Sequence, residues 1–203
     1  MLDHNDREKV EQYIKKIVAG ISDSIQQNIA NGMNNTDVID SAIRMTVNRI
    51  TPESKMILSS VYNMLMEKTL AKPLYQNPQN KAAFYSRDIL KNLTSTFSFE
   101  VPNHIDYEET QRLINKWTAS GAIVVAGGVV SITMTSVIPI AVAVVLAGIM
   151  FLLMKDKPAS GGQDVNKLIS DYLNDVKLSL MSWVREIEKS YDAELRKLEG
   201  GLS

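Results

Sequence analysis

Side chains that commonly carry catalysis are scarce in this chain, which has two histidines and no cysteine. The lack of cysteine excludes disulfides, thiolate zinc sites and cysteine nucleophiles. We expect His4 in an unstructured start and His104 beside the turn at Pro102, and neither has a carboxylate at metal-ligand spacing. The chain is therefore expected not to be an enzyme and to hold no metal and no cofactor.

Other short motifs also have ordinary interpretations. The pair Gly127-Gly128 is not accompanied by G-x-G-x-x-G or by G-K-[ST], so it does not predict a phosphate loop. Glu108 and Glu109 are typical of a solvated first turn that suits the helix dipole. The net charge of −1 provides no basic excess for nucleic acid or anionic lipid. We expect no nucleic-acid partner, and any membrane affinity must come from apolar surface.

The most informative feature is a stretch without charge, residues 117–154, which lies between Lys116 and Lys155 and is called the apolar segment below. One helical crossing of a bilayer needs about 20 apolar residues, so the segment is too long for one crossing and slightly short for two. Serines and threonines at 131–136, followed by Pro139, predict a turn. We expect a helical hairpin with arms at 121–138 and 139–154, about 27 and 24 Å long at about 1.5 Å per residue.

Three groups of residues in and beside the apolar segment are candidates for contact with lipid. The apolar positions expected to insert are Ala122, Val125, Val130, Ile132, Ile138, Pro139, Val145, Leu146, Ile149, Phe151 and Leu152. Small residues at helical spacing are expected to let the arms pack closely: Gly127, Ser131, Thr135, Ala143 and Ala147. The flanking residues suited to a bilayer interface are Lys116, Trp117, Lys155 and Lys157.

Amphipathic helices are predicted on both sides of the apolar segment. Residues 6–30 carry apolar side chains at steps of three and four, the asparagine-rich 31–35 breaks the pattern, and a second helix follows to Ile50. Thr51-Pro52-Glu53 predicts the start of a third helix, rich in Met and Leu. A loop at 72–80, a short helix around 84–93 and an extended loop at 94–102 are expected next, and then a helix that enters the segment.

The carboxyl-terminal region is predicted to be one long helix. Its apolar stripe runs from Val165 through Tyr172, Trp183 and Tyr191 to Leu198, with a period of about 3.67 residues that suits a nearly straight helix. The expected fold class is all-α: a helical bundle with a central hydrophobic helical hairpin and a long C-terminal amphipathic helix. The expected parts are 1–116 (helical bundle), 117–154 (hairpin), 155–163 (flexible connector) and 164–203 (long helix packed on the bundle).

Two parts of the apolar segment resemble the channel-forming domain of colicins: N-K-W-T-A-S-G-A-I-V-V-A-G-G at 115–128, and V-I-P-I-A-V-A-V-V-L-A-G-I at 137–149 with the following K-D-K at 155–157. The resemblance implies a helical bundle that sheathes a central apolar hairpin, which enters a membrane when the bundle opens. The order of amphipathic helix, hairpin and amphipathic helix also looks like other α-helical pore-formers, and like the membrane paddle of bacterial dynamin-like proteins.

These patterns lead to three hypotheses about function. The first is a membrane-inserting, pore-forming or permeabilising protein that oligomerises in the lipid bilayer. The second is a helical scaffold or adaptor constitutively anchored in a membrane by the hairpin. The third is a soluble bundle in which the hairpin is core. The charged N-terminus has no apolar stretch of a signal peptide, so we expect a membrane-associated protein made without one, with a soluble form.

Overall fold

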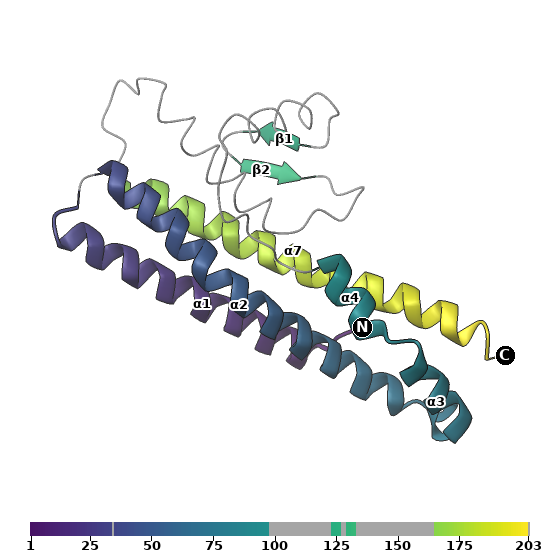
Figure 1. Cartoon of the computed structure of the whole chain (residues 1–203). Coiled ribbons are helices and arrows are strands. Elements are labelled where there is room, and N and C mark those ends of the chain that lie inside the picture. Colours follow the sequence, from purple (N-terminus) through teal and green to yellow (C-terminus); the bar gives the residue numbers. More distant parts are fainter. Residues whose placement is uncertain (34, 98–122, 127–128, 133–164, 203) are drawn as a thin grey trace.

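The described chain is mainly helical. The computed structural model describes residues 1–33, 35–97, 123–126, 129–132 and 165–202 (Figure 1). Its elements are α1 (His4–Ala30), α2 (Asn35–Leu70), the 3-10 helix η1 (Pro73–Gln76), α3 (Pro78–Ser86), α4 (Ile89–Phe97), strands β1 (Ile123–Ala126) and β2 (Val129–Ile132), and α7 (Val165–Glu199). The fold class is all-α, and the long C-terminal helix is present, as the sequence predicts.

Helices α1, α2 and α7 lie side by side along the length of the molecule, and we call them the helical body (Figure 1). Helix α2 runs antiparallel to α1, because Lys68 near its end is ion-paired with Asp3 before the start of α1. Helix α7 runs parallel to α2, so the start of α7 lies beside the end of α1, where Gln26 donates a hydrogen bond to Asn166. The chain between α2 and α7 must therefore return to the end at which α2 began.

The predicted apolar stripes of the long helices meet one another in the core. The buried side chains of α1 recur at steps of three and four, and α7 shows a similar stripe. They are Val10, Ile14, Ile17, Ile21 and Ile25 from α1, and Ile169, Tyr172, Val176, Leu180, Trp183, Ile187, Tyr191 and Leu195 from α7. Both predicted stripes are confirmed. Apolar residues that recur at the helical period lie on one face of the helix, and that face packs against the core.

Local signals explain where α1 begins and ends. The Asp3 side chain accepts a hydrogen bond from the Asp6 N–H at 2.9 Å and caps the helix. His4, expected in an unstructured start, is the first residue of α1. After Ala30 the turn passes through Gly32, whose φ of 80° is a conformation that favours glycine. The predicted break between the first two helices is confirmed.

The predicted helix boundary at Thr51 is wrong, since α2 continues from Asn35 to Leu70 with Pro52 inside it. Proline removes one helical hydrogen bond, but Pro52 is exposed, so water can solvate the carbonyl that loses its donor. The buried residues Ile50 and Ile57 flank the proline and hold both halves of the helix against the core. Tertiary packing therefore outweighs a local start signal.

The region after α2 differs from its prediction in two respects. Pro73 and Pro78 begin η1 and α3 within the expected loop, and Asn77 caps α3 by accepting the Gln79 N–H at 2.8 Å. Asp88, with a φ of 49°, separates α3 from α4 where one short helix was predicted. Helix α4 then extends to Phe97, which is 3% exposed, so the extended loop expected from residue 94 is wrong up to that point.

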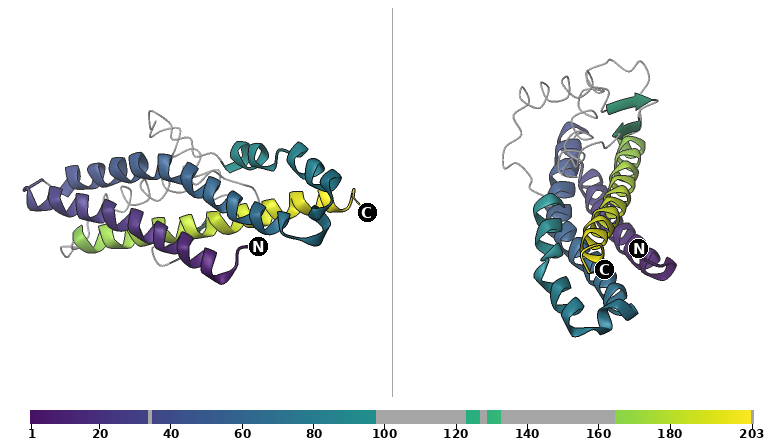
Figure 2. Two further views of the ribbon diagram at one scale, coloured as in Figure 1. Left: turned by 90° about the horizontal axis from the view of Figure 1, so that it is seen from below. Right: turned by 90° about the vertical axis from the view of Figure 1, so that its right-hand side faces the viewer.

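Figure 2 shows that α3 and α4 lie toward the end of the body where α7 finishes. Helix α4 packs against α7 and also touches α2. The rings of Tyr75 and Phe84 meet edge to face, with centroids 5.7 Å apart, and join η1 to α3. Buried side chains of these elements, such as Tyr75 and Leu93, thus extend the core at this end of the helical body.

The described part of the apolar segment is an antiparallel β-ribbon, which contradicts the helical arm predicted there. Strand β1 pairs with β2 across the two-residue connection at 127–128. The sequence I-V-V-A-G-G-V-V-S-I offers a reason, since β-branched residues favour strands and Gly-Gly suits a two-residue hairpin turn. The prediction of a helical arm rested on the length and apolar character of the stretch, and apolar character alone does not distinguish a helix from a strand.

Candidate functional site

Most residues of the predicted membrane-contact groups lie outside the described residues. Within the described part, Val125 lies in β1, whereas Val130, Ser131 and Ile132 lie in β2. Those outside are Lys116, Trp117, Ala122, Gly127, Thr135, Ile138, Pro139, Ala143, Val145, Leu146, Ala147, Ile149, Phe151, Leu152, Lys155 and Lys157. Their insertion, packing and interface roles stay predictions.

The register of the β-ribbon brings some predicted insertion residues into cross-strand pairs. Val125 pairs with Val130, and Ile123 pairs with Ile132. Ser131 pairs with Val124, although the small-residue stripe to which it was assigned has the four-residue spacing of a helix. The stripe is therefore not formed at Ser131 in this conformation.

The apolar segment is tethered through two helices of the described chain. It follows α4, whose last residue, Phe97, is buried, and it precedes α7, which begins at Val165. The two helices also contact each other. In the sequence, 19 residues separate Phe97 from the apolar segment, and 10 residues separate the segment from Val165.

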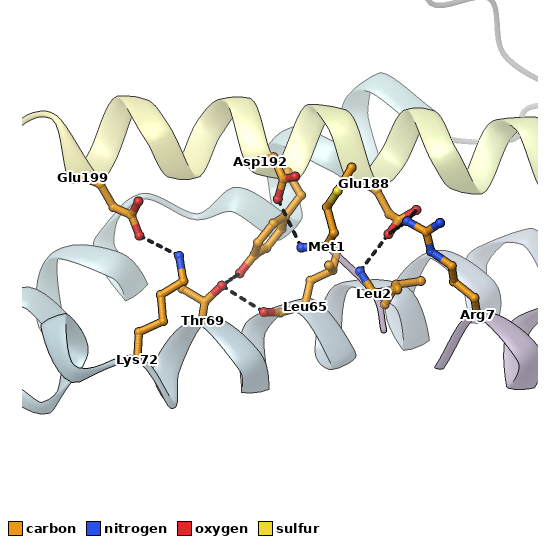
Figure 3. A network of polar contacts seen from close by, with 10 residues as sticks. Met1, Leu2, Arg7, Leu65, Thr69, Lys72, Glu188, Asp192 and Glu199 are labelled. Carbon is orange, nitrogen blue, oxygen red and sulfur yellow. Dashed lines mark hydrogen bonds and ion pairs between the residues drawn. The ribbon is translucent and has the colours of Figure 1, made fainter. Parts of the chain in front are cut away.

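Glu188 is the most buried carboxylate in the contact between α7 and α1. Its side chain is 3% exposed, and its Oε1 accepts the backbone N–H of Leu2 at 2.8 Å (Figure 3). The guanidinium of Arg7 lies 3.2 Å from the same oxygen and 3.3 Å from the other. A buried carboxylate is costly without such partners, so this arrangement secures the start of α1 on α7.

Lys68 makes the corresponding connection between α2 and the start of α1. Its ammonium group is ion-paired with Asp3 at 2.7 Å and with Asp6. Burial by itself would lower the pKa of Lys68, but the two aspartates more than offset this and raise the pKa. In return, the contact with Lys68 lowers the pKa of Asp3.

Two further glutamates of α7 form ion pairs with basic side chains from the region after α2. Glu194 lies 3.1 Å from Arg87, which precedes α4, and Glu199 lies 3.0 Å from Lys72 at the start of η1 (Figure 3 shows the latter pair). Tyr75 also donates to Glu199 at 3.4 Å. Burial, and then the charge of Glu199, raise the pKa of Tyr75 to about 12.

We call this end of the helical body the ion-paired end: residues 1–7 at the start of α1, residues 65–72 at the end of α2, and residues 183–199 of α7. Several ion pairs between different elements gather here. Acidic residues of α7 thus face cations from α1, η1 and the α3–α4 connection.

The opposite end of the body comprises residues 25–30, 35–46 and 165–180. Two of its contacts between helices join uncharged groups: Gln26 donates to Asn166 at 3.3 Å, and Asn28 donates to Ser41 at 2.8 Å. Tyr172 is buried beside Thr46; burial raises the pKa of Tyr172 to about 12 although its hydrogen bond with Thr46 opposes the shift. Helix α7 begins at this end.

A small groove between α1 and α7 has an apolar floor and charged rims. Val10 and Ile14 from α1 and Met181 and Val184 from α7 line its apolar part, within a volume of about 110 Å³. The rims carry Arg7, Glu11, Arg185 and Glu188. Arg7 and Glu188 already pair with each other, so the groove is part of the helix contact rather than a site for a sizeable ligand.

The described residues contain no cluster of three or more His, Cys, Asp or Glu side chains that could hold a metal ion. None of the described helices has both the length and the apolarity required to cross a bilayer. No protein-family model matches the chain, and no curated protein or solved structure matches it either.

Sequence reasoning overlooked the acidic residues of α7 that form the ion-paired end. Glu188 lies four residues after Val184 and three before Tyr191, so it shares a helix face with two apolar residues, and this spacing was a signal that it is buried. Its partners, Leu2 and Arg7, come from the other end of the chain. No local spacing can reveal such pairs.

Proposed function

We propose that the protein inserts its apolar segment, residues 117–154, into a lipid bilayer and permeabilises it. The observation that carries this proposal is the contrast in charge along the chain. The apolar segment has no charged residue between Lys116 and Lys155, whereas the helices of the body alternate buried apolar with exposed charged positions. A continuous uncharged stretch of this length suits the interior of a bilayer.

The packing of the helical body supports a release of the apolar segment in which the body itself stays folded. The apolar stripes of α1 and α7 are buried together with α2, in a core that also includes Ile57, Val61 and Leu65 of α2. Helices that bury their stripes on each other can remain folded while a connected segment changes its environment. The resemblance of residues 115–128 and 137–149 to the colicin channel domain supports the same function.

Entry into lipid requires the β-ribbon to refold. The described sheet has two strands, and the outer edges of a two-stranded ribbon need water or other partners for their backbone groups. In hydrocarbon such groups must be satisfied internally, which a helix or a closed barrel achieves. We therefore infer that residues 123–132 become helical on insertion, as the helical hairpin hypothesis requires.

Release of a trapped dye from liposomes tests the proposed function. Purified protein at micromolar concentration is expected to release dye, and Val130→Asp or Val145→Asp is expected to reduce release about 100-fold, because a carboxylate in an inserted arm costs about 2.5–3.5 kcal/mol. The control is Leu178→Asp, since Leu178 is 54% exposed on α7 and tolerates a charge. Absence of release by the unmodified protein would contradict the proposal.

The same preparation separates the two alternatives. Stable flotation with liposomes without release of dye would favour the anchored scaffold. Protein that remains soluble beside liposomes, with unchanged protease resistance of residues 117–154, would favour the soluble bundle.

A further inference from the structure

The bend between α3 and α4 is not a proline or glycine break. Residues 79–97 contain neither of these amino acids, which are the usual helix breakers. Asp88 nevertheless has a φ of 49°, a left-handed conformation that residues other than glycine rarely adopt. Its carboxylate accepts a hydrogen bond from the Lys91 N–H at 3.4 Å at the start of α4. The local preference for one helix therefore conflicts with the bend, and such conflicts are typical of strained or functional places.

Contacts with the helical body hold α4 in its bent position. Helix α4 packs against α7 and touches α2. Its buried side chains are Ile89, Leu93 and Phe97, none of them more than 3% exposed. Arg87, next to the bend, is paired with Glu194 of α7 at 3.1 Å. Tertiary packing thus imposes a bend that the helix preference of the sequence opposes.

A continuous helix over residues 78–97 would carry one unbroken apolar stripe. Positions separated by three or four residues lie on one face of a helix. The stripe at this spacing consists of Ala82, Tyr85, Ile89, Leu93 and Phe97. In the bent structure, Tyr85 is 55% exposed, whereas its neighbour Phe84 is buried against Tyr75. The bend therefore separates side chains that the sequence places on a single face.

The other face of the continuous helix would be basic. Lys81, Arg87 and Lys91 are its cations, and Asp88 is the one acidic residue in the sequence from 78 to 97, so this stretch carries a net charge of +2. The whole chain, in contrast, carries −1. An apolar face with aromatic residues and leucine, opposite a face with lysine and arginine, is typical of helices that lie in the interface of an anionic bilayer.

Phe84 offers a way for such a helix to stay attached to the body. It lies nine residues before Leu93, or two and a half turns at about 3.6 residues per turn, so the two side chains point to opposite sides of a continuous helix. Phe84 is 1% exposed, and its ring meets Tyr75 edge to face with centroids 5.7 Å apart. If this contact is kept, the apolar stripe faces away from the body, where a bilayer surface can contact it.

We propose that residues 78–97 bind the surface of an anionic lipid bilayer as one continuous amphipathic helix. In this step α4 leaves α7 and α2, and Asp88 changes to the right-handed helical conformation. Ile89, Leu93 and Phe97 exchange their burial in the protein for burial in the bilayer interface, and Tyr85 joins them there. The bilayer favours the continuous helix because the whole stripe contacts lipid only in this conformation. The inference deepens the proposed function and rests on it for the bilayer as the target.

Two substitutions of Asp88 form a matched test, because both remove the carboxylate that caps α4. Glycine adopts a φ of 49° readily and weakens a continuous helix, whereas alanine disfavours the bend and is the best helix former. Co-sedimentation with vesicles of phosphatidylcholine and phosphatidylserine measures the affinity. Asp88→Ala is expected to bind at least about fivefold more tightly than Asp88→Gly. A smaller difference, or tighter binding by Asp88→Gly, would overturn the inference.

The charge of the lipid is tested with two lysines. Lys91→Gln is expected to weaken binding to the phosphatidylserine vesicles about fivefold, which is the usual contribution of one cation near an anionic surface. Lys16→Gln is the control, since Lys16 is exposed on α1 and lies outside the proposed helix. Its affinity should stay within about twofold of the unmodified protein. Equal losses for the two variants, or the same loss for Lys91→Gln on vesicles of phosphatidylcholine alone, would overturn the role of residues 78–97.

Spin labels on single cysteines report the conformation on the vesicle, because the chain has no cysteine of its own. On the bilayer, the accessibility of labels to oxygen along residues 79–97 is expected to follow one helical period, with maxima at positions 82, 85, 89, 93 and 97. A break in this period at residue 88, as in the bent structure, would overturn the continuous helix.

Binding and release of dye distinguish the two ways to fail. If the unmodified protein releases no dye, the proposed function fails, and the two Asp88 variants still decide whether residues 78–97 bind lipid. If dye is released and the two Asp88 variants bind equally, the inference fails while the proposed function stands.

Discussion

The hydroxyl of Tyr191 on α7 donates a hydrogen bond to the hydroxyl of Thr69 on α2 at 2.9 Å. Thr69 in turn donates to the carbonyl of Leu65 at 2.9 Å, so its hydroxyl is satisfied as donor and acceptor (Figure 3). Both residues are buried. This contact links the two parallel helices of the body through side chains 122 positions apart in the sequence.

Replacement of Tyr191 by phenylalanine is expected to lower the free energy of unfolding by about 1–1.5 kcal/mol, because a buried hydrogen bond is lost while the ring remains. Urea denaturation measures the change. Tyr85→Phe is the control, since Tyr85 is 55% exposed and its replacement should alter stability by less than about 0.5 kcal/mol. Equal effects of the two substitutions would show that the Tyr191–Thr69 bond adds no net stability.

Glu188→Ala is expected to lower the free energy of unfolding by about 2–3 kcal/mol, because the Leu2 N–H and Arg7 lose their acceptor. Glu188→Gln retains an acceptor for the Leu2 N–H and should cost less. Glu186→Gln is a matched control on α7, whose contact with Lys189 lies within one exposed stretch of helix. A Glu188→Ala protein as stable as the Glu186→Gln protein would contradict the importance of Glu188 to the ion-paired end.

Pro52→Ala is expected to raise the free energy of unfolding by about 1–2 kcal/mol, since it restores a backbone N–H inside α2 at an exposed position. Thermal unfolding followed by circular dichroism measures the effect. Pro78→Ala is the contrasting substitution, because Pro78 begins α3, where a proline is favourable. A decrease in stability for Pro52→Ala would mean that packing of α2 depends on a bend at the proline.

Stability is expected to fall as the solution is acidified. The contact of Lys68 lowers the pKa of Asp3 below 3.8, and contacts of Lys197 and Arg87 lower the pKa of Glu194 below 4.5. A carboxylate with a lowered pKa in the folded state contributes stability above its unfolded pKa and loses it as the pH falls through the folded value. Urea denaturation at pH 7 and pH 3 should therefore show a decrease at the lower pH.

Glu194→Gln identifies the contribution of one group to that decrease. The variant is expected to be less stable than the unmodified protein at pH 7 and to lose less on acidification, because residue 194 can no longer take up a proton. Identical losses for both proteins would exclude Glu194 as a source of the pH dependence.

Individual elements differ in how far local sequence could predict them. The end of α1 was predicted from the asparagine- and glycine-rich break after Ala30, whereas its start was predicted at residue 6, because the cap at Asp3 was not recognised. Pro52 misled the prediction, because a local start signal carries no information about the buried Ile50 and Ile57 that keep α2 continuous. For residues 123–132, apolar character was noted, and the strand preference of Val and Ile was given too little weight.

For the candidate site, the sequence alone identifies the apolar segment and its lack of charge, because hydrophobicity and charge are properties of the residues themselves. It also determined the buried faces of α1 and α7, since a helix repeats its face at a fixed period. Tertiary structure alone decided that α7 lies parallel to α2 and that Glu188, Glu194 and Glu199 meet cations from distant elements. Such contacts depend on how helices are placed relative to one another, and no local period encodes that placement.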